Sequence, residues 1–131
     1  MRKVLIDTNI YTAFKLNNKK IISAFKHLDY IGIDITVLAE LYSGFKGGKK
    51  ERKNIDELEE FINSLCVHII NHDEITAEFY ANVFHILKNK GKHIPTNDIW
   101  IAAAALQNGL ALFTLDSHFS EIEILALKSD Y

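Results

Sequence analysis

The chain has 131 residues, of which 48% are hydrophobic, and its formal net charge is -2 at pH 7. This length and apolar content suit a single domain, residues 1–131, that folds around one core. The lone cysteine, Cys66, excludes an internal disulfide and favours a reducing, cytoplasmic compartment. We expect no membrane segment or signal peptide, since the apolar run near the N-terminus covers only residues 4–6.

The first half of the chain alternates strand and helix patterns. Residues 3–6 form a short apolar run that ends at Asp7, which predicts a buried strand, and Thr8 or Asn9 is a suitable cap for the helix that follows. Two short helices should be separated by a break near residues 17–18. A second strand is predicted at residues 30–35, followed by a helix at residues 36–45.

The second half continues in the same way. We expect an amphipathic helix at residues 55–65, a strand at 67–70 and a long helix from Glu74 to about Gly91. An alanine-rich helix should follow Pro95, with a strand at 111–114 and a weaker fifth strand at 122–125. This alternation predicts an α/β sandwich around a mostly parallel sheet.

Four acidic residues fall at informative places in this pattern. Asp7 and Asp116 each follow a predicted strand, and ligands of open α/β sheets bind beyond the carboxyl ends of the strands, where the strand order reverses. Glu40 and Asp98 lie in helices beside apolar neighbours. Each acid alone has an ordinary explanation as a helix cap, a first-turn anion or a turn residue. Together they suggest one acidic site.

Clustered carboxylates need cations to compensate their charge. Ligands that are all oxygen favour Mg²⁺ or Mn²⁺, one or two ions per site, and these ions can activate water to hydrolyse a phosphodiester. Short polar side chains beside the acids are suited to orient them. These supporting residues are Thr8, Asn9 and Thr114.

Four segments of the chain resemble the PIN-domain family, and most closely its VapC-type toxins. They are Leu5-Ile6-Asp7-Thr8-Asn9, Val37-Leu38-Ala39-Glu40-Leu41, Asn97-Asp98-Ile99-Trp100-Ile101-Ala102-Ala103 and Thr114-Leu115-Asp116-Ser117-His118-Phe119. The resemblance implies a three-layer α/β/α fold with a central sheet of four or five strands. It also implies metal-dependent endoribonuclease activity as the toxin of a toxin-antitoxin pair, homodimerisation and inhibition by a cognate antitoxin protein.

Two other functions stay open at this point. One is a metal-dependent phosphatase with Asp7 as nucleophile, although Asn9 stands where that chemistry expects a second acid. The other is a nonenzymatic PIN-like module that binds RNA. We interpret His118 as a surface turn residue, and Trp100 as a side chain of the core or of a dimer interface.

A basic segment lies between the two halves, and it either contacts RNA or is simply solvated. We define this basic segment as Lys46, Lys49, Lys50, Arg52 and Lys53. The number of large apolar side chains on the helices also predicts an exposed apolar patch, as expected at an interface.

Overall fold

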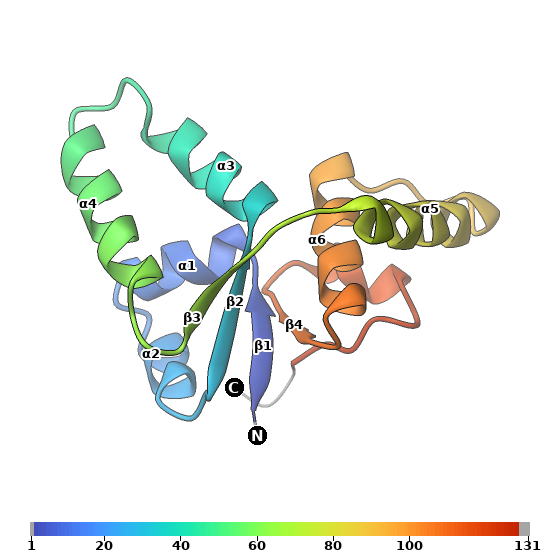
Figure 1. Ribbon diagram of the computed structural model, residues 1–131, viewed down its shortest axis with the longest axis horizontal. Coiled ribbons are helices and arrows are strands. Elements are labelled where there is room, and N and C mark those ends of the chain that lie inside the picture. Colours follow the sequence, from blue (N-terminus) through green and yellow to red (C-terminus); the bar gives the residue numbers. More distant parts are fainter. Residues whose placement is uncertain (1, 129–131) are drawn as a thin grey trace.

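The computed structural model describes residues 2–128, in which a four-stranded parallel sheet is flanked by helices (Figure 1). The strands are β1 (Lys3–Ile6), β2 (Tyr30–Asp34), β3 (Val67–Ile70) and β4 (Ala111–Phe113). The helices are α1 (Thr8–Lys15), α2 (Lys19–Phe25), α3 (Ile35–Phe45), α4 (Glu51–Ile62), α5 (Glu74–Asn89) and α6 (Thr96–Gln107). A short 3₁₀ helix, η1, covers Ser117–Glu121.

The strand order in the sheet is β3-β2-β1-β4. The chain therefore moves outward from β1 through β2 to β3, and then returns to place β4 on the other side of β1. In the register, Ile6 lies opposite Ile33 of β2 and Phe113 of β4. The strand order reverses at β1, so Asp7 and the residues after β4 meet at the edge where such sheets bind ligands.

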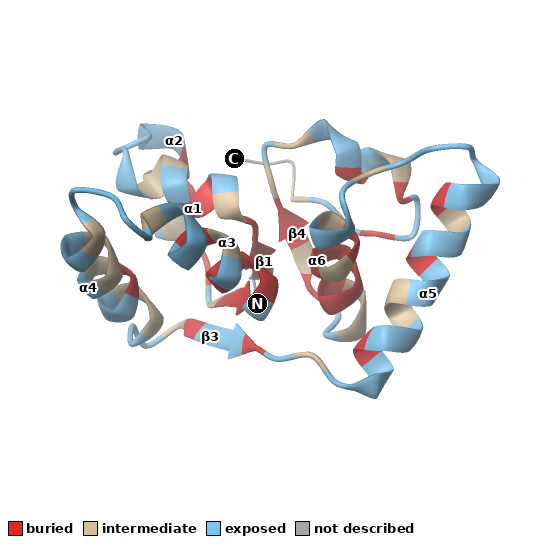
Figure 2. Cartoon of the chain, turned by 90° about the horizontal axis from the view of Figure 1, so that it is seen from above, coloured by how far each residue is buried: buried red, intermediate tan, exposed pale blue. Residues whose placement is uncertain are grey.

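The helices form the two outer layers of the predicted sandwich. Figure 1 shows α1, α2 and α4 on one side of the sheet, and α5 and α6 on the other. Helix α3 continues directly from β2 and contacts α1, α4 and α6. Residues 102–105 of α6 are all alanine and fully buried, and their small side chains let α6 pack closely between the sheet and α5. Figure 2 shows burial concentrated in β4 and α6, whereas the middle of β3 and the outer faces of α4 and α5 are exposed.

Acidic residues start three helices. The Asp7 side chain accepts a hydrogen bond from the Ile10 amide, Asp34 accepts one from Thr36, and Asp73 forms a capping box with Thr76. The prediction that Thr8 or Asn9 caps α1 is therefore wrong, because Asp7 already satisfies the amide at this helix start. Asp34 caps α3 in the same way, and β2 therefore ends at Asp34, one residue before the predicted end.

The predicted fifth strand at residues 122–125 is wrong. These residues form turns. The backbone pairs with the sheet only farther along the chain, through a single parallel bridge between Leu112 and Leu127. Ile122 and Leu125 are nevertheless buried, so their apolar character reflects core packing rather than strand pairing. Helix α4 also begins earlier than predicted, at Glu51, so that Arg52 and Lys53 lie in its first turn.

Some of the large apolar side chains on the helices are exposed, as predicted, and others are buried. Tyr11 and Leu41 are buried, as is Ile10, whereas Tyr42 and Phe84 are exposed. Within residues 2–128, none of the helices combines the length and the apolar character that crossing a membrane requires.

Candidate active site

All four predicted acids line one cavity of about 270 Å³ at the carboxyl edge of the sheet. Asp7 follows β1, Glu40 lies in α3, Asp98 in the first turn of α6, and Asp116 after β4. The other lining residues are Thr8, Asn9, Pro95, Asn97 and Ile101. Residues far apart in the sequence thus form a single acidic cavity. Asn97 was not predicted as a residue of the site. The signal that could have identified it was its position beside Asp98 at the start of α6.

Asp7 is the most buried of the four, with 4% of its surface exposed. One carboxylate oxygen accepts the Ile10 amide at 3.1 Å, and the other accepts the Thr114 hydroxyl. Burial raises the pKa of Asp7, against the lowering effect of these hydrogen bonds, and the charges of Asp116 and Glu40 raise it further. Asp7 is therefore both the cap of α1 and part of the acidic cavity.

Thr114 and Thr8, two of the three expected supporting residues, each form a hydrogen bond with an acid. The Thr114 hydroxyl donates to Asp7 and accepts the amide of Asp116 at 2.9 Å, so that one side chain joins two of the acids. The Thr8 hydroxyl donates to Oε1 of Glu40 at 2.7 Å. The third predicted support, Asn9, lines the cavity without a hydrogen bond to an acid among those of the described residues.

Asp98 is half-buried, and its environment disfavours its charge. Burial raises the pKa of Asp98 to about 6, with additional contributions from Asp116 and Glu40. An ionised carboxylate here is therefore costly unless a positive charge is nearby. This electrostatic need, together with oxygen donors, is the chemistry expected of a site for a hard divalent cation. The residues present fit such a divalent cation.

His118, which the sequence predicted to be a surface turn residue without a role in the site, lies near the acids. It is exposed, as expected of a turn residue, but its Nδ1 lies 3.2 Å from Oδ1 of Asp116. Among residues 2–128, one group of three metal-ligating side chains has all of its ligand atoms within 4.8 Å of one another, and it consists of Asp98, Asp116 and His118. The available signal was its spacing two residues after Asp116 in a turn.

A second acid–histidine pair, Asp34 and His72, lies outside the lining of the acidic cavity. Asp34 is fully buried and accepts the Thr36 amide at 3.1 Å, and His72 Nε2 lies 2.7 Å from its other oxygen. The His72 ring stacks on Trp100 of α6, with centroids 4.8 Å apart. Trp100 is thus half-buried in an aromatic contact within the chain. This contact joins the start of α3, which carries Glu40, to the helix that carries Asp98.

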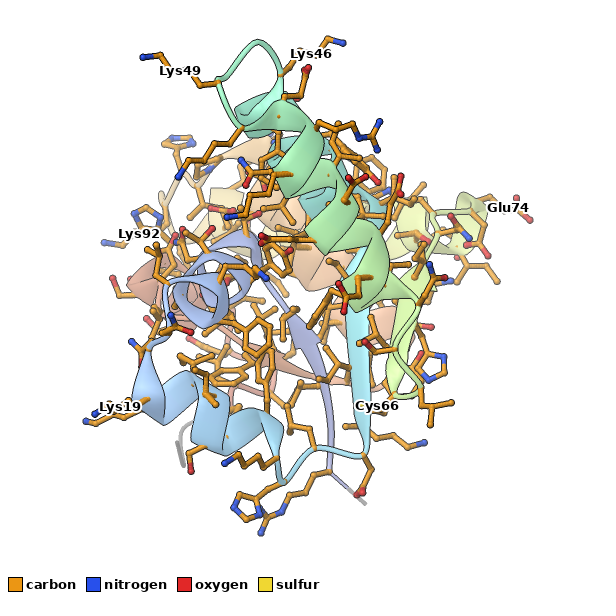
Figure 3. The ribbon with its side chains drawn as sticks, turned by 90° about the vertical axis from the view of Figure 1, so that its left-hand side faces the viewer. Lys19, Lys46, Lys49, Cys66, Glu74 and Lys92 are labelled. Atoms are coloured by element: carbon orange, nitrogen blue, oxygen red, sulfur yellow. The ribbon has the colours of Figure 1, made fainter. Side chains whose placement is uncertain are left out.

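The basic segment lies in and after the loop between α3 and α4. Figure 3 shows Lys46 and Lys49 extending from this loop into solvent. Arg52 is paired with Asp56 at 2.6 Å, and Lys53 lies 3.8 Å from Glu57. None of the five basic residues lines the acidic cavity.

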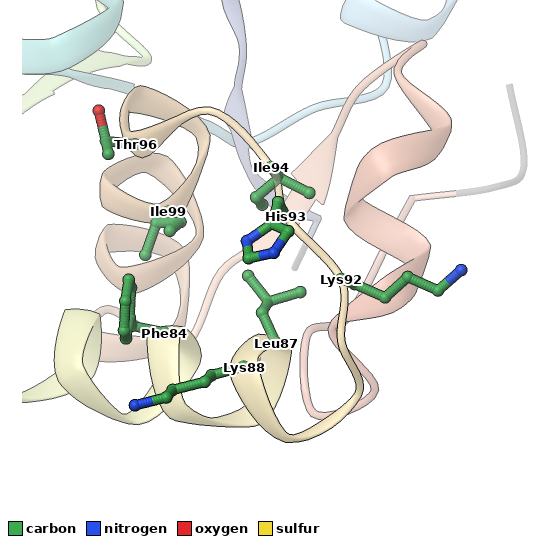
Figure 4. Close-up of a pocket in the computed structure, with 8 residues that line it drawn as sticks. All are labelled: Phe84, Leu87, Lys88, Lys92, His93, Ile94, Thr96 and Ile99. Carbon is green, nitrogen blue, oxygen red and sulfur yellow. The ribbon is translucent and has the colours of Figure 1, made fainter.

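A larger cavity, of about 330 Å³, lies between α5, α6 and the segment that joins them (Figure 4). Its walls include Phe84, Leu87, Ile94 and Ile99, and none of the described residues that line it is acidic. The side chains of Lys88 and Lys92 extend away from its centre (Figure 4). Size alone therefore does not identify the reactive site, because this cavity lacks titratable groups that converge.

Comparisons with known proteins agree with the fold. The PIN domain family matches residues 4–125. Ribonuclease VapC2 from Haemophilus influenzae is 31% identical, with 99% of this chain and 98% of that protein covered. Ribonuclease VapC2 from Rickettsia felis is 30% identical, with coverage of 95% and 96%.

Solved structures show the same relationship. The VapBC2 complex from Rickettsia felis bound to a DNA fragment from their promoter contains a chain with a TM-score of 0.87 and 28% identity, with 96% of this chain and 97% of that chain covered. A chain of VapBC-1 from nontypeable Haemophilus influenzae has a TM-score of 0.86 and 27% identity, with 97% of both chains covered. These matches favour the nuclease over the phosphatase alternative. The chain belongs to the PIN-domain family and, within it, resembles the VapC ribonucleases over nearly its whole length.

Proposed function

We propose that the chain is a divalent-metal-dependent endoribonuclease, the toxin of a toxin-antitoxin pair, which hydrolyses RNA phosphodiesters at Asp7, Glu40, Asp98 and Asp116. The observation that carries this proposal is the convergence of these four acids in one cavity at the point where the strand order reverses. The substrate class rests on the relatives, which are named as ribonucleases.

Charge compensation supports the metal requirement. Burial raises the pKa of Asp7 and of Asp98, so the fully ionised site is unfavourable without a cation. Mg²⁺ or Mn²⁺ suits these donors, and such an ion, when bound, lowers the pKa of water and offsets negative charge on the phosphate oxygens. One or two ions are compatible with a cavity of about 270 Å³.

The chain's own residues hold the acids in position. Asp7 is fixed by the Ile10 amide and the Thr114 hydroxyl, and Glu40 is oriented by Thr8. Because these donors are in place before any ligand arrives, the carboxylates need little rearrangement on binding. The phosphodiester itself would enter from the open side of the cavity, with the basic segment as a contact for more distant phosphates.

Two partners follow from the family. The solved relatives are toxin-antitoxin complexes, so we propose that a cognate antitoxin binds this chain and covers the acidic cavity. We also propose a homodimer in the cytoplasm, with the exposed Tyr42 or Phe84 at an interface. Light scattering should then report about twice the chain mass of 15.0 kDa. A monomer that still cleaves RNA would refute the dimer alone.

The function is tested with a circular RNA, which an exonuclease cannot degrade. Purified protein should linearise this RNA with Mg²⁺ or Mn²⁺, and should lose the activity in excess chelator. Asp116→Asn, prepared identically, is the control for a contaminating nuclease. Cleavage that persists in chelator would contradict the metal mechanism, and RNA that binds without being cut would favour the nonenzymatic module.

A further inference from the structure

His118 lies in the 3₁₀ helix that follows β4 and contacts Asp116, one of the acids that line the cavity. Its backbone amide donates to Oδ1 of Asp116 at 2.9 Å, so the turn that caps η1 also sets the position of the imidazole. Asp116 is itself held by the Thr114 hydroxyl at 2.9 Å. The backbone of this turn is therefore joined by hydrogen bonds to Asp116 and, through Thr114, to Asp7, and it holds the imidazole beside Asp116.

The distance from His118 to Asp116 matches that between neighbouring ligands of one metal ion, and Asp98 lies close enough to reach the same ion after a small side-chain movement. At metal–ligand distances of about 2.1 Å, neighbouring ligand atoms of an octahedral ion are about 3 Å apart and opposite ones about 4.2 Å apart. His118 Nδ1 and Asp116 Oδ1 are 3.2 Å apart. A ligand atom of Asp98 lies within 4.8 Å of ligand atoms on both of these residues.

A simple surface ion pair explains only part of this arrangement. Pairing with Asp116 accounts for the contact inside the turn, because the two residues are neighbours in the sequence. It does not account for the approach to Asp98, which comes from α6 and faces the same point from another element. Three potential ligands from two separate segments therefore converge on one small volume.

We propose that His118 is a nitrogen ligand of the divalent cation, together with Asp98 and Asp116, and that it makes the site prefer Mn²⁺ to Mg²⁺. This inference rests on the proposed metal-dependent function, and adds a residue outside the four acids. Mg²⁺ prefers oxygen ligands, whereas imidazole suits transition-metal ions. A nitrogen donor should thus strengthen Mn²⁺ binding more than Mg²⁺ binding.

Electron paramagnetic resonance of bound Mn²⁺ tests this directly, without measuring activity. In the full chain, prepared without a histidine tag, echo-modulation spectra should contain the nitrogen coupling of a coordinated imidazole. His118→Gln should lose this coupling, weaken Mn²⁺ binding by about 10-fold or more, and change Mg²⁺ binding, measured by competition, much less. His27→Gln, which changes an exposed histidine in the turn after α2, is the matched control and should retain both properties.

Each outcome is decisive. Thermal melting in chelator verifies that His118→Gln is folded, as expected for a side chain that is 57% exposed. If wild-type protein binds Mn²⁺ without nitrogen coupling, and Asp116→Asn abolishes that binding, the carboxylate site stands and the role of His118 is refuted. Nitrogen coupling that survives in His118→Gln also refutes it. If wild-type protein binds no Mn²⁺, the proposed metal site fails and this inference fails with it.

Discussion

Asp98→Asn should make the metal-free protein more stable at neutral pH, although it removes a residue of the active site. The pKa of Asp98 is raised from 3.8 to about 6, first by burial and then by Asp116 and Glu40. A difference of this size corresponds to ~3 kcal/mol of destabilisation when the carboxylate is ionised. Asp98 is only half-buried, so solvent screening reduces this to ~1.5 kcal/mol.

A second effect opposes this gain. Asp98 lies in the first turn of α6, where a negative charge stabilises a helix by ~0.5 kcal/mol. The expected net gain for Asp98→Asn is therefore ~1 kcal/mol, or ~4 °C in Tm for a chain of 131 residues. Glu74→Gln is the matched control, because Glu74 is an exposed acid in the first turn of α5. It should lose a little stability and gain none.

The pH dependence provides the sign check. Well below pH 3.8 both folded and unfolded protein carry a protonated Asp98, so the wild-type chain has no penalty there. Between 3.8 and about 6 the folded state binds more protons than the unfolded state, so the stability of wild type falls as pH rises. The advantage of Asp98→Asn should be complete above this window and should shrink as the pH falls through it.

Thermal unfolding followed by circular dichroism, in excess chelator at about pH 7.5 and about pH 4.5, measures both effects. Adding Mn²⁺ at the higher pH should stabilise wild type and have much less effect on Asp98→Asn. If Asp98→Asn melts below wild type at neutral pH by more than Glu74→Gln does, the ionised Asp98 carboxylate does not destabilise the fold as argued. The reasoning would also fail if the difference were independent of pH.

Four other predictions concern cleavage, binding and stability. Asp116→Asn should reduce RNA cleavage by ~10²-fold or more while the circular dichroism spectrum is unchanged, because the amide lacks the charge that compensates a cation. Thr114→Val should reduce cleavage by ~10-fold to 100-fold, and Thr114→Ser should restore it, because only the hydroxyl joins two acids. Replacing the five residues of the basic segment with Gln should make RNA binding less dependent on salt, so that the plot of log binding constant against log salt becomes less steep by about 2. Lys19→Gln with Lys20→Gln, as a control, should not change this slope. Asp34→Ala should lower the free energy of unfolding by ~2–3 kcal/mol in urea titrations, because it removes a helix cap and leaves His72 without its partner, and an unchanged midpoint would contradict this.

Much of the fold and the acid set follows from local patterns. Strand lengths, helix periodicity and breaks at residues such as Asn17, which has a φ of 62°, are properties of neighbouring residues and can be read along the chain. Asp7 and Asp116 could be predicted to meet because strands that run parallel end at the same edge of a sheet. Glu40 and Asp98 were supported by the family resemblance, since a helix alone does not show which neighbour its acid faces.

The local signal was ambiguous where apolar residues are buried for a different reason. Residues 122–125 have the composition of a strand, yet they only pack on the core, and the bridge to β4 is made later, at Leu127. An apolar composition indicates that a segment is buried, but it does not indicate whether the backbone of that segment pairs with a neighbouring strand.

The sequence by itself determined which acids are present and on which elements they lie. Tertiary structure alone decided that His118 approaches Asp98, and that Asp34 joins His72 across a separation of 38 residues. Such contacts depend on the path of loops and the packing of helices, which bring together residues with no periodic relation in the chain. For this reason the acidic residues could be identified from the sequence, whereas the approach of His118 to them and the pairing of Asp34 with His72 could not.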